Sequence, residues 1–344
     1  MRLKEFQQYL KQEKIDLTVF IHPDINITYF TQLKPSFALL AITPTTASFY
    51  LSGLDDVPKL KGISVKVLKK GWEKKLANPK VKKVGINKDV VSVGFWEKLH
   101  KLFPKAKLVD VSGELKQLRA QKTEEEVKKV GYACKVTDDA FNELVNCWKK
   151  QKFKTEQDVA HFLEEYFRKH KCTTAFPTIA AMGKNAAIPH YHTSKGKLKR
   201  GFLLLDFGAS YQNYNADCSR TLFLGTPSKA ERELYELLLK AQQSAIAQIN
   251  AGKTFWELQQ SVKRGLGKYS SHFIHLLGHG VGIDVHETPS FSLEAKEKIK
   301  NGQVFTIEPG IYFPKKCGLR IEDTVWFDGK VKVLTKSPKE LITL

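Results

Sequence analysis

Four acidic residues, each placed among apolar residues that predict buried strands, constrain the fold of this 344-residue chain more than any other sequence feature. They are Asp206 after the apolar run 202–205, Asp217 eleven residues later, Glu308 after 304–307, and Glu322 within 319–325. A carboxylate in such surroundings is costly unless a cation or hydrogen bonds compensate its charge. If the four lie together, positive charge must lie between them.

The spacing of Asp206 and Asp217 predicts that they lie side by side. A turn near 211–213 would join two neighbouring strands, so that the second carboxylate returns close to the first. The alternative is structural: Asp217 forms an ion pair with Arg220, three residues further on. Ion pairs of that kind also perturb carboxylates without any catalytic role.

Histidines gather in a glycine-rich segment at 275–287. His275, His279 and His286 lie within twelve residues, and glycines at 278, 280 and 282 allow tight turns around His279. A lone histidine in a loop is most often structural. Three in such a segment favour a metal ligand or a catalytic group.

Two Asp, two Glu and one His together favour a particular kind of metal site. Carboxylates with few nitrogens suit two divalent ions about 3.5–4 Å apart, with a hydroxide held between them. No cysteine belongs to this set, which disfavours a structural zinc site.

Periodicity predicts the elements around these residues. The first third alternates helices and short strands, typical of a small α/β domain. After residue 112 longer helices begin, the first with the capping pattern Thr123-Glu124-Glu125-Glu126. Helices are expected near 2–14, 92–103, 123–149, 155–170 and 228–249, and strands at 17–21, 37–42, 47–51, 64–68 and 82–86.

The ordered motifs resemble those of the pita-bread metallopeptidases, in the branch of Xaa-Pro aminopeptidase and Xaa-Pro dipeptidase (prolidase). The motifs are Asp206 with Asp217, G-H-G-V-G-I-D-V-H-E at 278–287, T-I-E-P-G-I-Y at 306–312 and L-R-I-E-D-T-V at 319–325. The resemblance covers 120–344, and the segment 26–31 resembles a creatinase-type N-terminal domain. It implies an α/β N-terminal domain at 1–115 and an α+β pita-bread catalytic domain at 120–344.

The resemblance also implies roles for individual residues. Asp206 would chelate one metal ion, Asp217 and Glu322 would bridge two, and His279 and Glu308 would complete the second. Manganese is the first expectation for both ions, with cobalt, zinc and iron as alternatives.

Catalytic roles follow for Glu308 as general base and for His190 and His286 as donors to the substrate and the developing oxyanion. His192 is an alternative to His190, since the interval to Asp206 is one residue shorter than the family pattern. His275 and Arg320 are expected to contact substrate, with Arg320 resembling the arginine that lies beside the family's metal ligands. The proton donor to the leaving nitrogen stays open.

The implied activity is hydrolysis of the N-terminal peptide bond preceding proline through a metal-bridging hydroxide, by an aminopeptidase or a dipeptidase. Methionine aminopeptidase specificity is one alternative, although R-I-E-D at 320–323 and the additional N-terminal domain favour the Xaa-Pro branch. A non-catalytic member that binds protein or RNA is the other, and the complete ligand set argues against it.

Composition limits the partners. The net charge is +20, but only eight of the 56 basic residues are arginine, so we expect a lysine-rich solvated surface and no nucleic-acid site. No apolar run approaches the roughly 18 residues of a membrane span. Five cysteines without a C-x-x-C pair indicate a reducing cytoplasm. The resemblance implies a homodimer.

Overall fold

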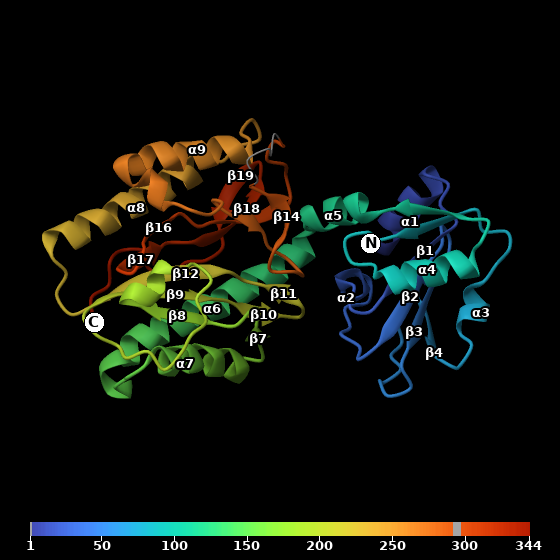
Figure 1. The fold of residues 1–344 in the computed structure, drawn as a ribbon, viewed down its shortest axis with the longest axis horizontal. Helices are drawn as coiled ribbons and strands as arrows, with labels where there is room; N and C mark the ends of the chain where they lie inside the picture. Colours follow the sequence, from blue (N-terminus) through green and yellow to red (C-terminus); the bar gives the residue numbers. More distant parts are fainter. Residues whose placement is uncertain (1, 292–296) are drawn as a thin grey trace. The chain divides into compact units, whose positions relative to one another are not determined.

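The computed structural model describes residues 2–291 and 297–344 (Figure 1). The chain forms two compact units, Met1–Leu118 and Arg119–Leu344. The domain boundaries expected from the sequence, 1–115 and 120–344, stay a prediction. Helix α5 (Ser112–Ala120) runs across the end of the first range at residue 115.

The N-terminal unit is built on a six-stranded mixed sheet in the order β4-β3-β2-β1-β5-β6. Its strands are β1 (Leu17–Ile21), β2 (Ala38–Ile42), β3 (Ala47–Leu51), β4 (Ser64–Val67), β5 (Lys83–Ile86) and β6 (Lys107–Asp110). Its helices are α1 (Arg2–Gln12), α2 (Ile25–Thr31), α3 (Glu73–Leu76), α4 (Val93–Leu102) and α5. Neighbouring residues of β1 enter different cores, Phe20 with α1 and Val19 with α4, so both faces of the sheet are covered.

The C-terminal unit contains several small sheets between pairs of helices. Its sheets are β12-β9-β8, β11-β10-β7, β14-β13-β15-β18-β19 and β16-β17. The strands are β7 (Thr173–Thr174), β8 (Ile179–Met182), β9 (Gly201–Phe207), β10 (Ala209–Tyr211), β11 (Tyr214–Asn215), β12 (Cys218–Leu224), β13 (His279–Gly280), β14 (Glu287–Ser290), β15 (Gln303–Ile307), β16 (Gly310–Phe313), β17 (Cys317–Arg320), β18 (Asp323–Asp328) and β19 (Lys330–Val333).

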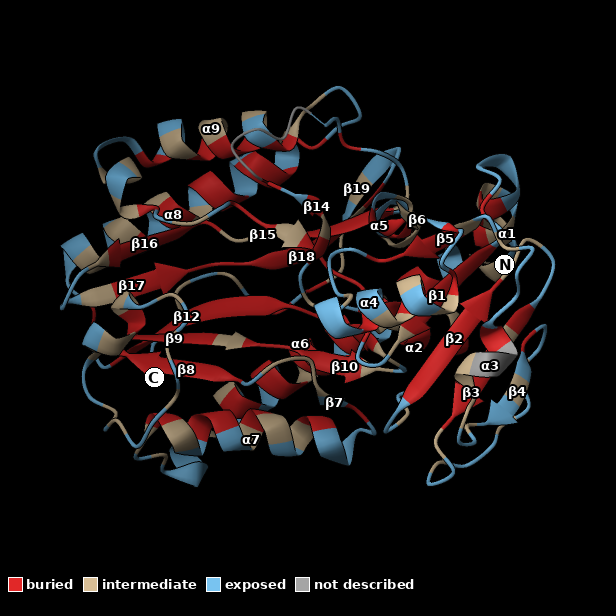
Figure 2. Ribbon diagram, turned by 45° about the vertical axis from the view of Figure 1, so that its right-hand side comes forward, coloured by how far each residue is buried: buried red, intermediate tan, exposed pale blue. Residues whose placement is uncertain are grey.

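Helices cover these sheets from two sides. The helices are α6 (Glu124–Gln151), α7 (Glu156–Lys169), α8 (Lys229–Ala247) and α9 (Phe255–Leu266), with short 3₁₀ turns η1 (Gly183–Ala187) and η2 (Gly267–His272). Leu144 and Leu163 of α6 and α7 pack on β9, while Leu238 and Phe255 of α8 and α9 pack on the side of β15. Figure 2 shows most of these strands buried and the outer faces of the helices exposed.

Local sequence explains where these helices begin. Thr123 caps α6 and Glu126 reaches back to the backbone of Thr123, which is the predicted capping box. Ser228 and Glu231 form the same arrangement at α8. The predicted helices at 2–14, 92–103, 123–149, 155–170 and 228–249 all form, with ends that shift by a few residues. Strand β6, short and half-exposed, was not predicted.

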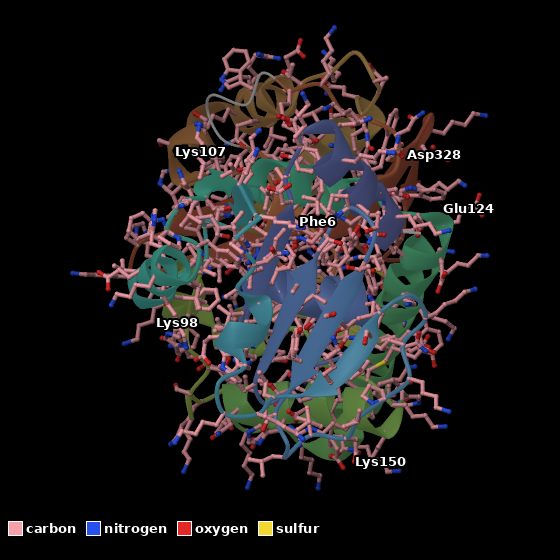
Figure 3. The ribbon with its side chains drawn as sticks, turned by 90° about the vertical axis from the view of Figure 1, so that its right-hand side faces the viewer. Phe6, Lys98, Lys107, Glu124, Lys150 and Asp328 are labelled. Atoms are coloured by element: carbon pink, nitrogen blue, oxygen red, sulfur yellow. The ribbon has the colours of Figure 1, made fainter. Side chains whose placement is uncertain are left out.

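The surface is rich in lysine, and Figure 3 shows Lys107 and Lys150 extending away from the ribbon. Within residues 2–291 and 297–344, no helix is long and apolar enough to cross a membrane. All five cysteines are free thiols, so no disulfide joins any pair of them.

Candidate metal centre

The β9–β12 pair positions the two aspartates. Asp206 lies opposite Ser219 in the antiparallel register, and Asp217 comes directly before the first residue of β12. The chain turns between β10 and β11 at Gln212 and Asn213, whose φ angles of 47° and 69° are left-handed. The predicted turn at 211–213 is therefore confirmed.

The two glutamates come from the later strands of the unit, β15 to β18. Glu308 directly follows β15, as the sequence predicts. Glu322 lies between β17 and β18 rather than inside a strand, because the chain leaves the β16–β17 hairpin there and enters the five-stranded sheet. Its backbone N–H donates to the carbonyl of Ser219 at 3.0 Å, which fixes Glu322 beside β12.

Glycine allows the backbone of β13 to approach its neighbours. A Cβ at Gly278 would collide with the carbonyl of Thr306, and one at Gly280 with the carbonyl of Thr288. The glycines that flank His279 are therefore required by close packing of the strands.

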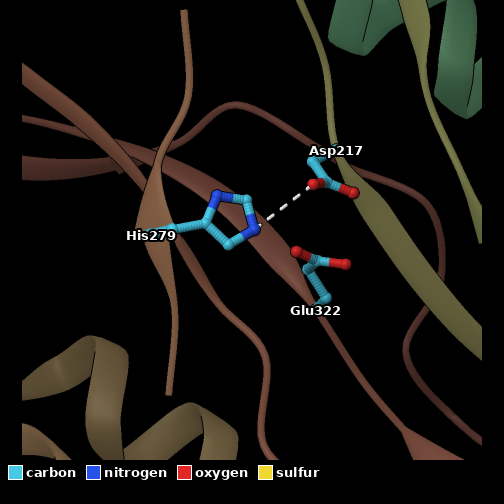
Figure 4. Close-up of side chains that lie close together, drawn as sticks. All are labelled: Asp217, His279 and Glu322. Atoms are coloured by element: carbon cyan, nitrogen blue, oxygen red, sulfur yellow. Dashed lines mark ion pairs between the residues drawn. The ribbon is translucent and has the colours of Figure 1, made fainter. Parts of the chain in front are cut away.

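Asp217, His279 and Glu322 form the tightest group (Figure 4), with one ligand atom of each within 4.8 Å of the others. His279 Nε2 lies 3.5 Å from Asp217 Oδ2 and 3.3 Å from Glu308 Oε1. Three of the five expected ligands are thus in mutual reach, and a fourth, Glu308, lies beside the imidazole of His279. The fifth, Asp206, lies at the far end of a hydrogen-bond bridge through Ser219.

Ser219 and Arg320 make that bridge. The Ser219 hydroxyl lies 2.7 Å from Glu322 Oε2 and 3.2 Å from Asp206 Oδ1. Arg320 donates to the Ser219 hydroxyl at 2.7 Å and to Asp206 Oδ2 at 2.6 Å. One buried guanidinium therefore compensates part of the negative charge at this end of the site.

Burial and mutual repulsion dominate the electrostatics of the acids. Burial, then the charges of Glu322 and Asp206, raise the pKa of Asp217 well above its usual range. Burial, then Glu308 and Asp206, do the same to the pKa of Glu322, and burial also raises that of Glu308. Asp217, Glu308 and Glu322 therefore favour their neutral forms unless positive charge is added between them.

The ring of His279 is oriented as a ligand would be. Its Nδ1 lies 3.2 Å from the carbonyl of Gly280, an acceptor, which favours the proton on Nδ1. Burial lowers the pKa of His279, which favours the neutral ring, and Nε2 faces Asp217 and Glu308. Thr306 donates to Glu308 Oε1 at 3.2 Å and fixes that carboxylate.

The other predicted histidines surround this group. The ring of His286 lies 4.1 Å from that of His279, and its side chain is exposed. Both ring nitrogens of His275 have partners, the Leu276 carbonyl at 2.7 Å and the Tyr312 hydroxyl at 2.8 Å. His190 is exposed. The pKa values of His275 and His286 are lowered mainly by burial, and the charge of His190 adds to the lowering of both, so His190 lies near them.

The structure overturns the alternative pairing of Asp217 with Arg220. Arg220 lies 2.8 Å from Asp323 on β18, because its side chain leaves β12 on the face opposite to the candidate site. In the part of the chain that the structure describes, the ion-pair partner of Arg220 is Asp323, and that of Asp217 is His279. The expected contact of Arg320 with substrate stays a prediction. In the structure its guanidinium donates to Ser219, Asp206 and the Tyr312 hydroxyl.

Sequence reasoning did not single out Ser219, Thr306 or Tyr312. Thr306 and Tyr312 belong to the motif T-I-E-P-G-I-Y, so the motif itself carried that signal. Ser219 gave none, because a serine beside an acidic residue is common, and only the strand register reveals its bridging position.

The residues fit two divalent cations. Glu322 Oε1 is buried without a hydrogen-bond partner, a costly state unless another group binds it. The donors are carboxylate oxygens and one imidazole nitrogen, which suit such ions. Two divalent ions carry as many positive charges as the four carboxylates carry negative ones.

Comparison with known proteins covers both units. The model described as metallopeptidase family M24 matches residues 128–328. The model of the creatinase/prolidase N-terminal domain matches residues 2–121. Together the two matches confirm the two-part fold that the sequence predicts.

Individual relatives align along nearly the whole chain. An Xaa-Pro dipeptidase of Pyrococcus horikoshii is 34% identical over 349 residues, covering 99% of this chain and 98% of the relative. Among solved structures, the prolidase from Pyrococcus horikoshii OT3 has a TM-score of 0.88 at 32% identity, covering 99% of both chains. The X-Pro aminopeptidase from Thermotoga maritima has a TM-score of 0.91 at 30% identity, again covering 99% of both.

Proposed function

Because the chain belongs to metallopeptidase family M24, we propose that it hydrolyses the N-terminal peptide bond of short peptides whose second residue is proline. The observation that carries this proposal is the cluster of Asp217, His279 and Glu322, with Glu308 beside His279 and one Glu322 oxygen buried without a hydrogen-bond partner. Relatives named Xaa-Pro dipeptidase that align along nearly the full chain support the choice of substrate.

Asp206, Asp217, His279, Glu308 and Glu322 would hold two divalent ions. When bound, such ions lower the pKa of a water molecule towards neutrality and polarise the scissile carbonyl. Manganese is proposed as the native metal, and the oxygen-rich donor set supports it, although the same set suits cobalt, iron and zinc.

Glu308 is proposed as the general base. Thr306 occupies its Oε1, which leaves Oε2 to take the proton of the attacking water. Burial raises its pKa towards the working pH, which improves a carboxylate as a proton acceptor. The same group can return the proton to the prolyl nitrogen, which must be protonated for the C–N bond to break and the amine to leave.

His286 and His190 are proposed to bind the substrate carbonyl. Both side chains are exposed, so substrate can reach them, and His286 lies beside His279. A hydrogen bond from either imidazole would strengthen as negative charge develops on the oxygen. His275 and Tyr312 would shape the neighbouring wall of the site through their mutual hydrogen bond.

A peptide panel tests the proposal. Metal-loaded protein is assayed with Ala-Pro, Ala-Pro-Ala and Met-Ala, and Asp217→Asn serves as the matched inactive control. Cleavage of both proline peptides identifies an aminopeptidase, and cleavage of Ala-Pro alone identifies a dipeptidase. Cleavage of Met-Ala without either proline peptide would contradict the proposed specificity and favour the methionine alternative.

We also propose a homodimer that works in a reducing cytoplasm. Five free thiols, three of them buried, support a reducing compartment. The family resemblance supports the dimer, and sedimentation equilibrium of the metal-loaded protein tests it. A monomer at all concentrations would contradict it.

A further inference from the structure

A buried ion pair next to the candidate site takes no part in the proposed chemistry. Lys122 Nζ lies 2.7 Å from Glu287 Oε1, and each side chain is only 1% exposed. Arg119 Nε lies 3.4 Å from the other oxygen of Glu287. Desolvating two charges is expensive, and an apolar pair of similar size often stabilises a fold as well or better. The pair therefore calls for a reason other than stability.

The position of Glu287 in the chain provides that reason. It directly follows His286, which is exposed and so cannot be oriented by core packing. Glu287 in contrast is buried, and it begins β14. A fixed Glu287 therefore fixes the backbone from which His286 projects.

The loop that precedes His286 closes over the same pair. A Cβ at Gly282 would collide with the carboxylate of Glu287 and approach the Lys122 side chain. On its other side the loop is held by Asn215, whose backbone N–H donates to the Gly282 carbonyl at 2.8 Å and whose side chain donates to the Ile283 carbonyl at 3.1 Å. The loop is thus held between the ion pair and the segment that leads to Asp217.

The lysine itself is firmly placed. The backbone N–H of Lys122 donates to the carbonyl of Gly302 at 2.7 Å. Burial lowers the pKa of Lys122, while the neighbouring charges of Glu287 and Glu126 favour its ammonium form. Glu126 is itself held by the Tyr214 hydroxyl at 2.9 Å. Lys122 is therefore fixed in position, and its ammonium group holds the Glu287 carboxylate in place.

We propose that Lys122 and Glu287 are positioning residues that hold the loop 282–287 and thereby place the imidazole of His286 beside that of His279. This inference rests on the proposed role of His286 in peptide hydrolysis. It assigns a specific task to a pair that contacts neither the substrate nor the expected metal ligands.

Double-mutant cycles on the metal-loaded protein test the inference. Lys122→Met and Glu287→Gln are each expected to lower kcat by about 10- to 10²-fold, the size of a small misplacement of a catalytic group. KM and metal content should stay within about twofold of wild type. In a His286→Ala background the same changes should lower kcat no further, because the group that they position is already gone. Lys122→Arg, which keeps the charge, should recover part of the loss.

Leu144→Ala is the matched control for stability, since it opens a cavity in the α6 core far from the loop and costs about 2–5 kcal/mol. It should leave kcat unchanged below its melting temperature. The combined Lys122→Met/Glu287→Gln variant removes both charges and covers the case in which a single variant does not fold. In metal-free protein, the His286 ring signal in NMR should shift in Lys122→Met and stay unchanged in Leu144→Ala.

The outcomes distinguish failure of the positioning role of Lys122 and Glu287 from failure of the proposed role of His286. If His286→Ala lowers kcat but the pair variants do not, or if they lower it equally without His286, the positioning role is overturned and the proposed function stands. If His286→Ala leaves kcat unchanged, the role of His286 and the inference that depends on it are both overturned.

Discussion

Two neighbouring residues, Glu322 and Asp323, lie in buried charge clusters of opposite character. Asp323 accepts from Arg220 at 2.8 Å, Lys339 at 2.7 Å and Gln242 at 2.8 Å. Burial alone would raise the pKa of Asp323, but the charges of Arg220 and Lys339 outweigh burial and lower it. For Glu322, burial and the charges of Glu308 and Asp206 raise the pKa.

The difference shows how a structural acid can be told from a functional one. The Asp323 cluster is complete, because cations and hydrogen bonds from the chain satisfy the carboxylate. The Glu322 cluster is incomplete, because one of its oxygens is buried without a partner and its neighbours are mostly acids. The two side chains diverge because successive residues of extended chain point to opposite faces.

The largest expected effect breaks the incomplete cluster. Asp217→Asn keeps the shape of the side chain but removes one of the charges that would hold metal. We expect kcat/KM to fall by at least about 10²-fold, since even partners one step further from a metal have effects of this size. Metal content measured by mass spectrometry should fall in parallel. Without metal, the variant should be at least as stable as metal-free wild type, because one of the mutually repelling charges has been removed. A variant that still binds metal and still hydrolyses peptides would refute the site.

Breaking the complete cluster should instead damage the fold. Arg220→Met leaves Asp323 with less compensation in a buried position and should cost about 3–5 kcal/mol of unfolding free energy. Urea unfolding of metal-free protein measures this loss. If the variant keeps its stability but loses metal, the two clusters are one functional unit and the contrast between them fails.

A change at the edge of the incomplete cluster should affect the rate alone. His286→Ala removes a donor to the substrate carbonyl, and kcat should fall by roughly 10²–10³-fold, as for loss of one oxyanion donor. Metal content and unfolding free energy should equal those of wild type, measured on the same sample. Lost metal would make His286 a ligand, and an unchanged kcat would leave it without a catalytic role.

The smallest expected effect comes from an ion pair at the surface whose two charges compensate each other. Glu231 lies 2.6 Å from Arg200, and the hydrogen bond from Arg200 is the main cause that lowers the pKa of Glu231 to about 2. Because the folded pKa is depressed, the stabilisation is present above the unfolded pKa of roughly 4.3 and is lost as the pH falls towards 2. Solvent screening limits the contribution of this ion pair to the unfolding free energy to under about 1 kcal/mol.

Glu231→Gln keeps the capping geometry of α8 and removes only the charge. Its melting temperature should lie slightly below that of wild type at pH 7, and the two should converge only as the pH approaches about 2. A difference that persists undiminished at that pH would mean that the pair is not electrostatic in origin.

The fold and the gathering of acidic residues near His279 could be predicted because their signals are local. Asp206, Glu308 and the glycines around His279 each lie in a short segment whose pattern has a direct physical meaning. Arg220 could not be assigned, because its partner Asp323 is 103 positions away and a nearer acid was available. Lys122 and Ser219 were missed for a related reason: only the register of distant strands shows what they touch.

The close approach of β13 to its neighbours sets limits on how this site can diversify. At positions 278 and 280 every substitution meets backbone carbonyls that cannot move aside, so a saturation library should lose nearly all of its members there. At position 286 the side chain is exposed, and most members should fold. New specificities should therefore arise around an invariant glycine frame, through exchange of the side chains that face the substrate.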